Sequence, residues 1–221
     1  MRKFWVIVGK DLLLELRTKD TWVGMLAFVV MVIFLFAFAF GTDRSQVRQT
    51  FSGILWLAFL FAGILGVGRT YHHEMPEEAL VGLMLAPGER TWIVVAKMSV
   101  AFCFMFGLEL VASPLFFILL NQPWTGRWAA YLAALALGAW GFVGVGTLLS
   151  ALAANVRSGE ALLPLLLVPL EIPVLITAVE ATRAILATPP GNPWGWLEGL
   201  LAYDVIFLAL PLVLYDYLWE V

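Results

Sequence analysis

The sequence predicts an all-α integral membrane protein, with six transmembrane helices preceded by an amphipathic interfacial helix. Of its 221 residues, 62% are apolar and only 13% are charged, whereas soluble domains average about 45–50% apolar and about 25% charged residues. Six apolar runs approach or exceed the length of about 20 residues that a helix needs to cross the hydrocarbon core. These runs leave no room for a folded soluble domain, so we treat residues 1–221 as a single transmembrane domain.

The same composition excludes several classes of function. A soluble enzyme, a disordered protein or a nucleic-acid-binding protein needs more polar surface, and a net charge of −3 provides no basic field for nucleic acid. The sequence contains no GxxxxGK[ST], GxSxG, HExxH or CxxC motif. The only histidines, His72 and His73, are adjacent and cannot bind one metal as an i, i+4 pair does. We therefore expect no catalytic residue, no metal site and no firmly bound cofactor.

The first 20 residues are predicted to form an amphipathic helix. Apolar or small residues recur at the spacing of one helical face, and charged residues occupy most of the remaining positions. This face consists of Trp5, Val8, Gly9, Leu12, Leu13 and Leu16. Two interpretations remain open: an anchor that lies on the lipid surface, or an elbow helix that packs on a neighbouring subunit and transmits its movement.

The six apolar runs follow this helix in order. They cover residues 22–40, 51–68, 98–120, 128–154, 161–179 and 200–218. The first, second and fourth runs contain no charged residue, whereas Asp204 and Asp216 interrupt the sixth, whose limits are therefore the least defined. Tryptophans near several run ends are typical of an interfacial aromatic belt.

The distribution of cationic residues predicts the orientation. An even number of spans places both termini on one side of the membrane. Nine of the thirteen Lys and Arg residues fall on that side, so the positive-inside rule places both termini in the cytoplasm. The sequence thus predicts a multi-pass protein of the cytoplasmic (inner) membrane.

The longest polar interval inside the chain, residues 69–91, is predicted to be a cytoplasmic loop. Pro76 suits a first helical position, and the carboxylates of Glu77 and Glu78 favour the positive end of a helix dipole. The residues that would form the apolar face of this short helix are Leu80, Leu83 and Met84. Because the anionic inner leaflet would repel its acidic front, docking of a soluble partner is favoured over contact with lipid.

Two acidic residues and three prolines stand out inside the runs. Glu109 and Glu171 lie near the middle of the third and fifth runs, where a charge costs about 2.5–3.5 kcal/mol on insertion scales. Either they line a cavity or a substrate path, or they are protonated and hydrogen-bonded to a neighbouring helix. The prolines of the fifth run are Pro164, Pro169 and Pro173. Each removes a backbone donor, so a kinked or broken, partly re-entrant segment is expected.

Small residues in the fourth run are spaced for close helix packing. At small-xxx-small spacing, two backbones can approach closely. The residues at this spacing are Ala130, Ala134 and Gly138, followed by Gly146, Ser150 and Ala154. They predict either packing within the bundle or a seam between two copies of the chain.

Three segments resemble a known family. They are KDLLLELR at 10–17, LMLAPGERTWIVVAK at 83–97 and LLPLLLVPLEIPVLI at 162–176. These segments resemble cytochrome c maturation protein B, also called haem exporter protein B, a family of permease subunits of type-2 ABC exporters. The resemblance extends over essentially the whole chain, and its most specific part is the proline-rich fifth run.

The resemblance implies a permease subunit of an ATP-driven complex for c-type cytochrome biogenesis, which exports haem or releases a haem chaperone. It implies a separate cytoplasmic ABC ATPase that alone binds ATP, a second copy of the chain, a haem-handling membrane protein and a haem chaperone as partners, with haem as a candidate cargo. The residues expected to couple to the ATPase are Glu74, Pro76, Glu77, Glu78, Leu80, Leu83 and Met84. A permease for another cargo and a non-transporting scaffold remain the alternatives.

Overall fold

The computed structural model describes residues 5, 8–10, 20–41, 43–72, 91–153 and 159–218. Its long helices are α2 (Asp20–Phe40), α3 (Arg44–His72), α5 (Thr91–Leu119), α6 (Trp128–Ala153), α7 (Gly159–Leu186) and α8 (Trp194–Leu218). All six are long and apolar enough to cross a membrane. They confirm the predicted all-α class and the six predicted spans.

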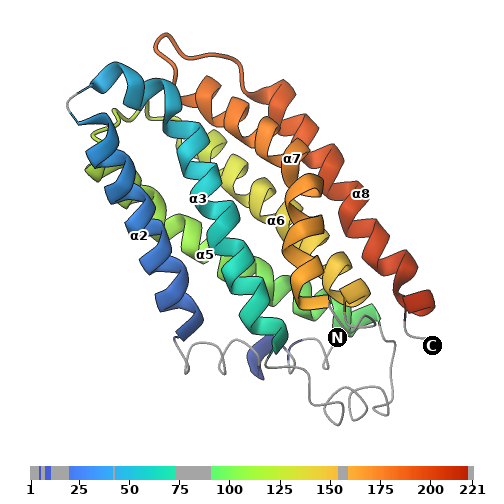
Figure 1. Ribbon diagram of the computed structural model, residues 1–221. Helices are drawn as coiled ribbons and strands as arrows, with labels where there is room; N and C mark the ends of the chain where they lie inside the picture. The colour runs from blue at the N-terminus through green and yellow to red at the C-terminus, as the bar shows by residue number, and fades with distance from the viewer. Residues whose placement is uncertain are drawn as a thin grey trace.

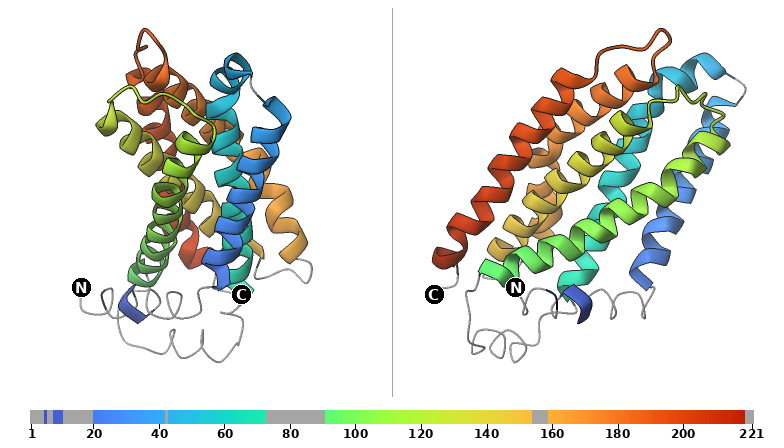
Figure 2. Two further views of the ribbon diagram at one scale, coloured as in Figure 1. Left: turned by 90° about the vertical axis from the view of Figure 1, so that its left-hand side faces the viewer. Right: turned by 180° about the vertical axis from the view of Figure 1, so that it is seen from behind.

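The helices pack side by side in one bundle, with consecutive helices running in opposite directions (Figures 1 and 2). α6 packs against α5, α7 and α8, and α3 packs against α2 and α7. The start of α2 and the end of α8 lie at the same end of the bundle (Figure 1). That end also holds the end of α3 and the start of α5, on either side of residues 73–90.

α3 begins at Arg44, several residues before the apolar run that predicts it. Its N-cap is Asp43, whose carboxylate Oδ1 accepts hydrogen bonds from the Ser45 hydroxyl at 2.7 Å, the Ser45 amide at 3.0 Å and the Gln46 amide at 3.3 Å. The Ser45 hydroxyl and the Gln46 amide lower the pKa of Asp43 below its ordinary value. A capped helix can start in polar sequence, and hydropathy does not detect its first turns.

α8 also begins earlier than predicted, and this corrects the limits of the sixth run. The sequence places that run at 200–218, but the helix starts at Trp194 and its membrane-spanning part is Trp194–Pro211. The side-chain oxygen of Asn192 caps the helix by accepting a hydrogen bond from the Trp194 amide at 3.1 Å. Glu198 precedes the predicted run but lies within the helix, and its side chain is exposed.

α7 continues past the apolar run to Leu186. The extension contains Glu180 and Arg183, which form an ion pair one helical turn apart. Oppositely charged residues three apart support a helix, so the charges that end the apolar run in the sequence do not end the helix.

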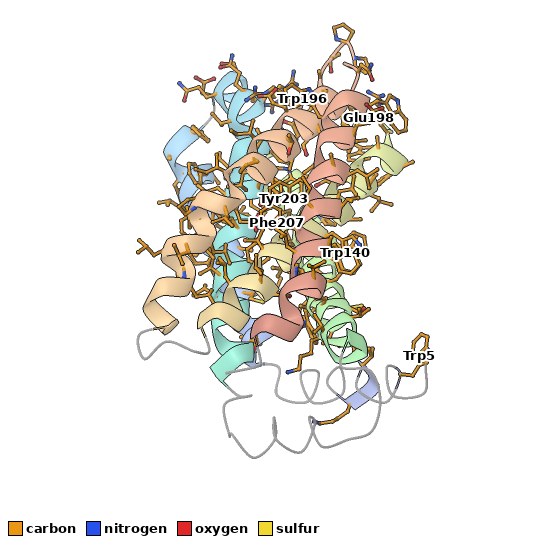
Figure 3. The ribbon with its side chains drawn as sticks, turned by 90° about the vertical axis from the view of Figure 1, so that its right-hand side faces the viewer. Trp5, Trp140, Trp196, Glu198, Tyr203 and Phe207 are labelled. Carbon is orange, nitrogen blue, oxygen red and sulfur yellow. The ribbon has the colours of Figure 1, made fainter. Side chains whose placement is uncertain are left out.

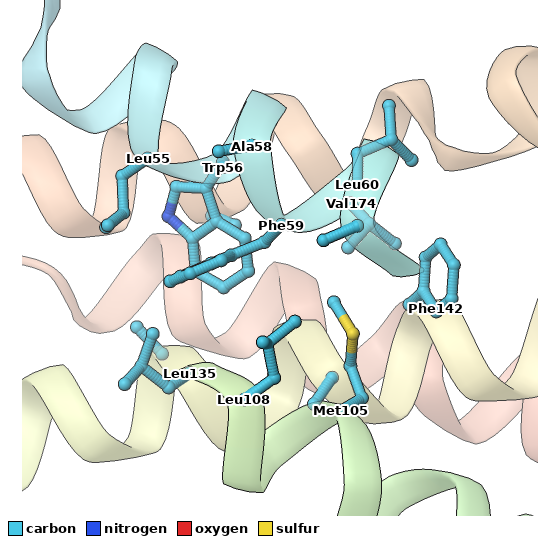
Figure 4. Packing of buried hydrophobic residues seen from close by; sticks show 14 of the residues in the cluster. Leu55, Trp56, Ala58, Phe59, Leu60, Met105, Leu108, Leu135, Phe142 and Val174 are labelled. Atoms are coloured by element: carbon cyan, nitrogen blue, oxygen red, sulfur yellow. The ribbon is translucent and has the colours of Figure 1, made fainter. Parts of the chain in front are cut away.

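Aromatic residues of α3 fill the centre of the bundle (Figure 4). Trp56 and Phe59 lie opposite Leu108 of α5 and Leu135 of α6. Gly138 on α6 makes room for Trp56, since a Cβ there would lie 2.2 Å from the indole ring. Pairs of a glycine and an aromatic ring therefore set how closely α3 and α6 approach.

Part of the N-terminal segment contacts the bundle. Val8 is buried against Ala96 and Val100 of α5. Trp5 is 71% exposed and points away from the helices (Figure 3). Of the predicted apolar face, Val8 thus packs on the same chain, whereas Leu12, Leu13 and Leu16 lie outside the described residues.

Candidate functional site

The predicted coupling residues lie outside the part of the chain that the structure describes. They are Glu74, Pro76, Glu77, Glu78, Leu80, Leu83 and Met84. The helices on either side of them are described: α3 ends at His72 and α5 begins at Thr91. Residues 73–90 therefore connect two helix ends at the end of the bundle where α8 also ends (Figure 1).

Glu109 lies in the middle of α5 and is completely buried. Neither of its carboxyl oxygens has a hydrogen-bond partner among the described residues. One turn further along α5, the Ser113 hydroxyl accepts a hydrogen bond of 2.9 Å from the Tyr131 hydroxyl of α6. Glu109 lies close enough to Tyr131 for electrostatic interaction, so these three side chains form a buried polar patch between α5 and α6.

A second polar patch lies where α6, α7 and α8 meet. Glu171 of α7 is 1% exposed and Asp204 of α8 is 7% exposed. Asp204 Oδ1 lies beside Val174 of α7 and Gly141 of α6, since a Cβ at Gly141 would be 3.0 Å from that oxygen and 2.9 Å from Val174 Cγ2. Val174 follows Glu171 by three residues on the same face of α7, and the two carboxyl groups are close enough for their charges to interact.

These carboxyl groups have few partners. Both oxygens of Asp204 and Oε1 of Glu171 are buried without a hydrogen bond to any described residue. The described residues also contain no group of three or more His, Cys, Asp or Glu side chains that could hold a metal ion. The patch at α6, α7 and α8 thus consists of two carboxyl groups in apolar surroundings.

Asp204 is the buried acid that sequence reasoning missed. In the sequence it is only an interruption of the sixth run, near the expected start of that run. Because α8 begins at Trp194, Asp204 instead lies well inside the span. The rule that marked Glu109 and Glu171, an acid within an apolar span, would have found it had the start of the helix been known.

The prolines of the fifth run, Pro164, Pro169 and Pro173, lie within the single helix α7. Figure 1 shows that α7 changes direction part-way along its length. The Tyr203 hydroxyl of α8 donates a 2.7 Å hydrogen bond to the Leu170 carbonyl, and Thr177 donates one of 2.7 Å to the Pro173 carbonyl. Neither carbonyl lies four residues before a proline, so these bonds do not replace the backbone bonds that the prolines remove; the Tyr203 bond instead ties α8 to the bent part of α7.

The opposite end of the bundle has an open pocket of about 390 Å³. Its lining includes Trp128 at the start of α6 and Trp194 at the start of α8, which are 61% and 62% exposed. Arg127 also lines it and donates a 2.7 Å hydrogen bond to the Gly191 carbonyl. This arrangement agrees with tryptophans that lie at a membrane interface.

Comparison with known proteins connects this architecture to a family. The model of the CcmB protein family matches residues 2–213. Heme exporter protein B of Rhodobacter capsulatus is 34% identical over 181 residues, which cover 80% of this chain and 81% of the relative. Heme exporter protein B of Pseudomonas aeruginosa is 32% identical over 202 residues, which cover 90% of this chain and 89% of the relative.

A third relative, heme exporter protein B of Escherichia coli K12, is 32% identical over 186 residues, which cover 82% of each chain. The family match includes all three segments that carry the resemblance, at 10–17, 83–97 and 162–176. The chain is a multi-pass membrane protein of six spans, and it belongs to the CcmB protein family.

Proposed function

We propose that this chain is the permease subunit of an ATP-driven transporter for c-type cytochrome biogenesis, which exports haem or releases a haem chaperone. The observation that supports this proposal is the family match over residues 2–213, in a chain whose six spanning helices form one bundle. Relatives that cover most of the chain carry the name heme exporter protein B. In the first of these activities haem is the cargo, and in neither is it a resident cofactor of this chain.

The energy for transport comes from a separate cytoplasmic ABC ATPase. This chain has no P-loop of its own, so it binds no ATP by that route and acts as a non-catalytic membrane subunit. The ATPase docks on residues 74–85, where the acidic residues Glu74, Glu77 and Glu78 precede the apolar residues Leu80, Leu83 and Met84. The end of α3 and the start of α5 are the parts of the bundle that receive movement from this loop.

Both termini and the docking loop face the cytoplasm, and the chain lies in the cytoplasmic membrane. The positive-inside distribution of Lys and Arg supports this orientation, and the start of α2 and the end of α8 lie at one end of the bundle. The assembly includes a second copy of this chain, a haem-handling membrane protein and a haem chaperone. Lipid surrounds the remaining apolar surface.

Deletion of the gene tests the proposed role. We expect the deleted strain to lose c-type cytochromes, in which haem is covalently attached, and to keep its b-type cytochromes. A plasmid with the wild-type gene should restore the c-type cytochromes, whereas one that encodes Glu77→Lys should not. Glu198→Lys, a matched change of an exposed acid at the other end of the bundle, should restore them. Normal c-type cytochromes in the deleted strain would contradict the proposal.

A further inference from the structure

We propose that Glu171 and Asp204 form a proton-binding site between α7 and α8, in which one carboxyl group is protonated and donates a hydrogen bond to the other. Both side chains are at least nine-tenths buried. Asp204 Oδ1 lies beside Val174, one turn from Glu171 on the same face of α7. Both acids therefore lie at the contact between these helices, close enough for their charges to interact.

Three buried oxygens of this pair have no hydrogen-bond partner among the described residues. A buried polar group without a partner is rare in native structures, and two carboxylates side by side in apolar surroundings repel each other. One shared proton reduces both problems, because a single O–H···O bond gives two of the three oxygens a partner and the pair keeps only one negative charge.

The described helices around the pair present few ionisable groups to it. α6 presents Gly141 to the site, and its only ionisable described side chain is Tyr131, which donates to Ser113. The described side chains of α3 at 49–66 include no ionisable group. On α8 itself, Tyr203 lies near both acids, but its hydroxyl donates to the Leu170 carbonyl. The described ionisable side chains of α5 are Lys97, Cys103 and Glu109. Of these Glu109 is the buried acid, and it lies near Tyr131.

The site adjoins the bent part of α7. Glu171 lies between Pro169 and Pro173, and its neighbour Leu170 accepts the hydrogen bond from Tyr203 of α8. Loss of the shared proton would place two like charges at the contact between α7 and α8. Proton occupancy therefore controls how tightly α8 holds the proline-containing segment of α7, independently of which cargo the protein carries.

Infrared spectroscopy of the purified full-length protein in lipid nanodiscs tests the site directly. Glu109→Gln serves as the parent, because it removes the third buried carboxyl group. A triple variant adds Glu171→Gln and Asp204→Asn to this parent. The parent spectrum minus the triple-variant spectrum should contain the C=O stretch of a protonated carboxyl group at neutral pH. This band should move in D₂O and disappear as the pH rises. Absence of the band at neutral pH would overturn the proposal.

Single substitutions test whether the proton is shared. Replacement of either acid by its amide removes the negative neighbour of the other, so the remaining carboxyl group should lose its proton at a pH lower by about one unit or more than in the parent. If the midpoint pH of proton loss is the same in both single variants as in the parent, the two acids titrate independently and the proposal of a shared proton is overturned.

Thermal unfolding provides a second measurement. A proton held more tightly in the folded state than in the unfolded state stabilises the fold at low pH, and this stabilisation is lost as the pH rises through the folded-state midpoint. The parent should therefore unfold at lower temperature as the pH rises. This pH dependence should be weaker in the triple variant, in which Glu109→Gln is combined with Glu171→Gln and Asp204→Asn. Equal pH dependence in both proteins would contradict the proposal even if the infrared bands overlapped.

Discussion

The indole N–H of Trp56 on α3 donates a 2.9 Å hydrogen bond to the hydroxyl of Thr182 on α7, and both residues are buried. The same indole ring occupies the space that Gly138 leaves on α6. A single side chain thus contacts two other helices, through a polar bond to one and through close packing with the other. Interhelical bonds of this kind contribute about 0.6 kcal/mol on average and up to about 1.7 kcal/mol in a membrane.

Removal of this bond should destabilise the bundle. Trp56→Phe keeps an aromatic ring but removes the donor, so Thr182 loses its partner, and we expect the free energy of unfolding to fall by about 0.6–1.7 kcal/mol. Chemical unfolding of the purified protein, followed by circular dichroism, measures this change. Trp128→Phe is the matched control, because Trp128 is 61% exposed. Equal effects of the two substitutions would argue against the structural role of Trp56.

The close approach at Gly138 gives a second prediction. In Gly138→Ala the new Cβ would lie 2.2 Å from the Trp56 ring, and overpacking of this kind typically costs about 1–3 kcal/mol. Gly53→Ala is the control on α3, where a Cβ meets nothing within 4 Å, and the higher helix propensity of alanine should make it neutral or stabilising. The same unfolding experiment compares the two variants. A destabilised Gly53→Ala and an unaffected Gly138→Ala would contradict the packing described above.

The N-cap of α3 should depend on pH. Hydrogen bonds from the Ser45 hydroxyl and the Gln46 amide lower the pKa of Asp43, so the stabilisation is present above its ordinary pKa and is lost as the pH falls through the lower, folded-state pKa. Asp43→Ala should speed hydrogen exchange at the amides of Ser45 and Gln46. Asp43→Asn can still cap the helix, so it should protect these amides better than alanine and without the pH dependence. Equal exchange in wild type and Asp43→Ala would refute the cap.

The cytoplasmic loop gives a prediction that rests on sequence alone. Glu77→Lys reverses a charge at the start of the predicted helix, and Leu80→Asp places a charge on its apolar face. Each variant should reach the membrane in normal amount but should no longer co-purify with the ATPase. Glu198→Lys changes an exposed acid at the other end of the bundle and should keep the ATPase bound. ATPase binding by both loop variants would move the docking site elsewhere.

Hydropathy was sufficient to predict the number and order of the spans, because each crossing requires a long apolar run. It did not place the start of α3 or of α8. Those helices start at the polar caps Asp43 and Asn192, which lie outside the apolar runs. Length and apolarity thus determine that a helix crosses the membrane, whereas local hydrogen bonds determine where it begins.

The buried polar residues were only partly predictable. An acid within a span was reason enough to single out Glu109 and Glu171. These helices are apolar on all sides, however, so the sequence does not show which side of each helix faces which neighbour. The sequence therefore could not show that Asp204 faces α7 or that Gly141 lies beside it. The small-xxx-small spacing did single out Gly138, yet its neighbour proved to be the ring of Trp56 and not another small residue.

The central claim is that this chain is the permease of an ATP-driven complex for c-type cytochrome biogenesis. The most direct test is gentle purification of the tagged full-length chain from its own membranes, followed by mass spectrometry of the proteins that co-elute. An ABC ATPase together with haem-handling membrane proteins is the predicted result. Recovery of the chain with no ATPase, under conditions in which other membrane complexes stay intact, would contradict the claim.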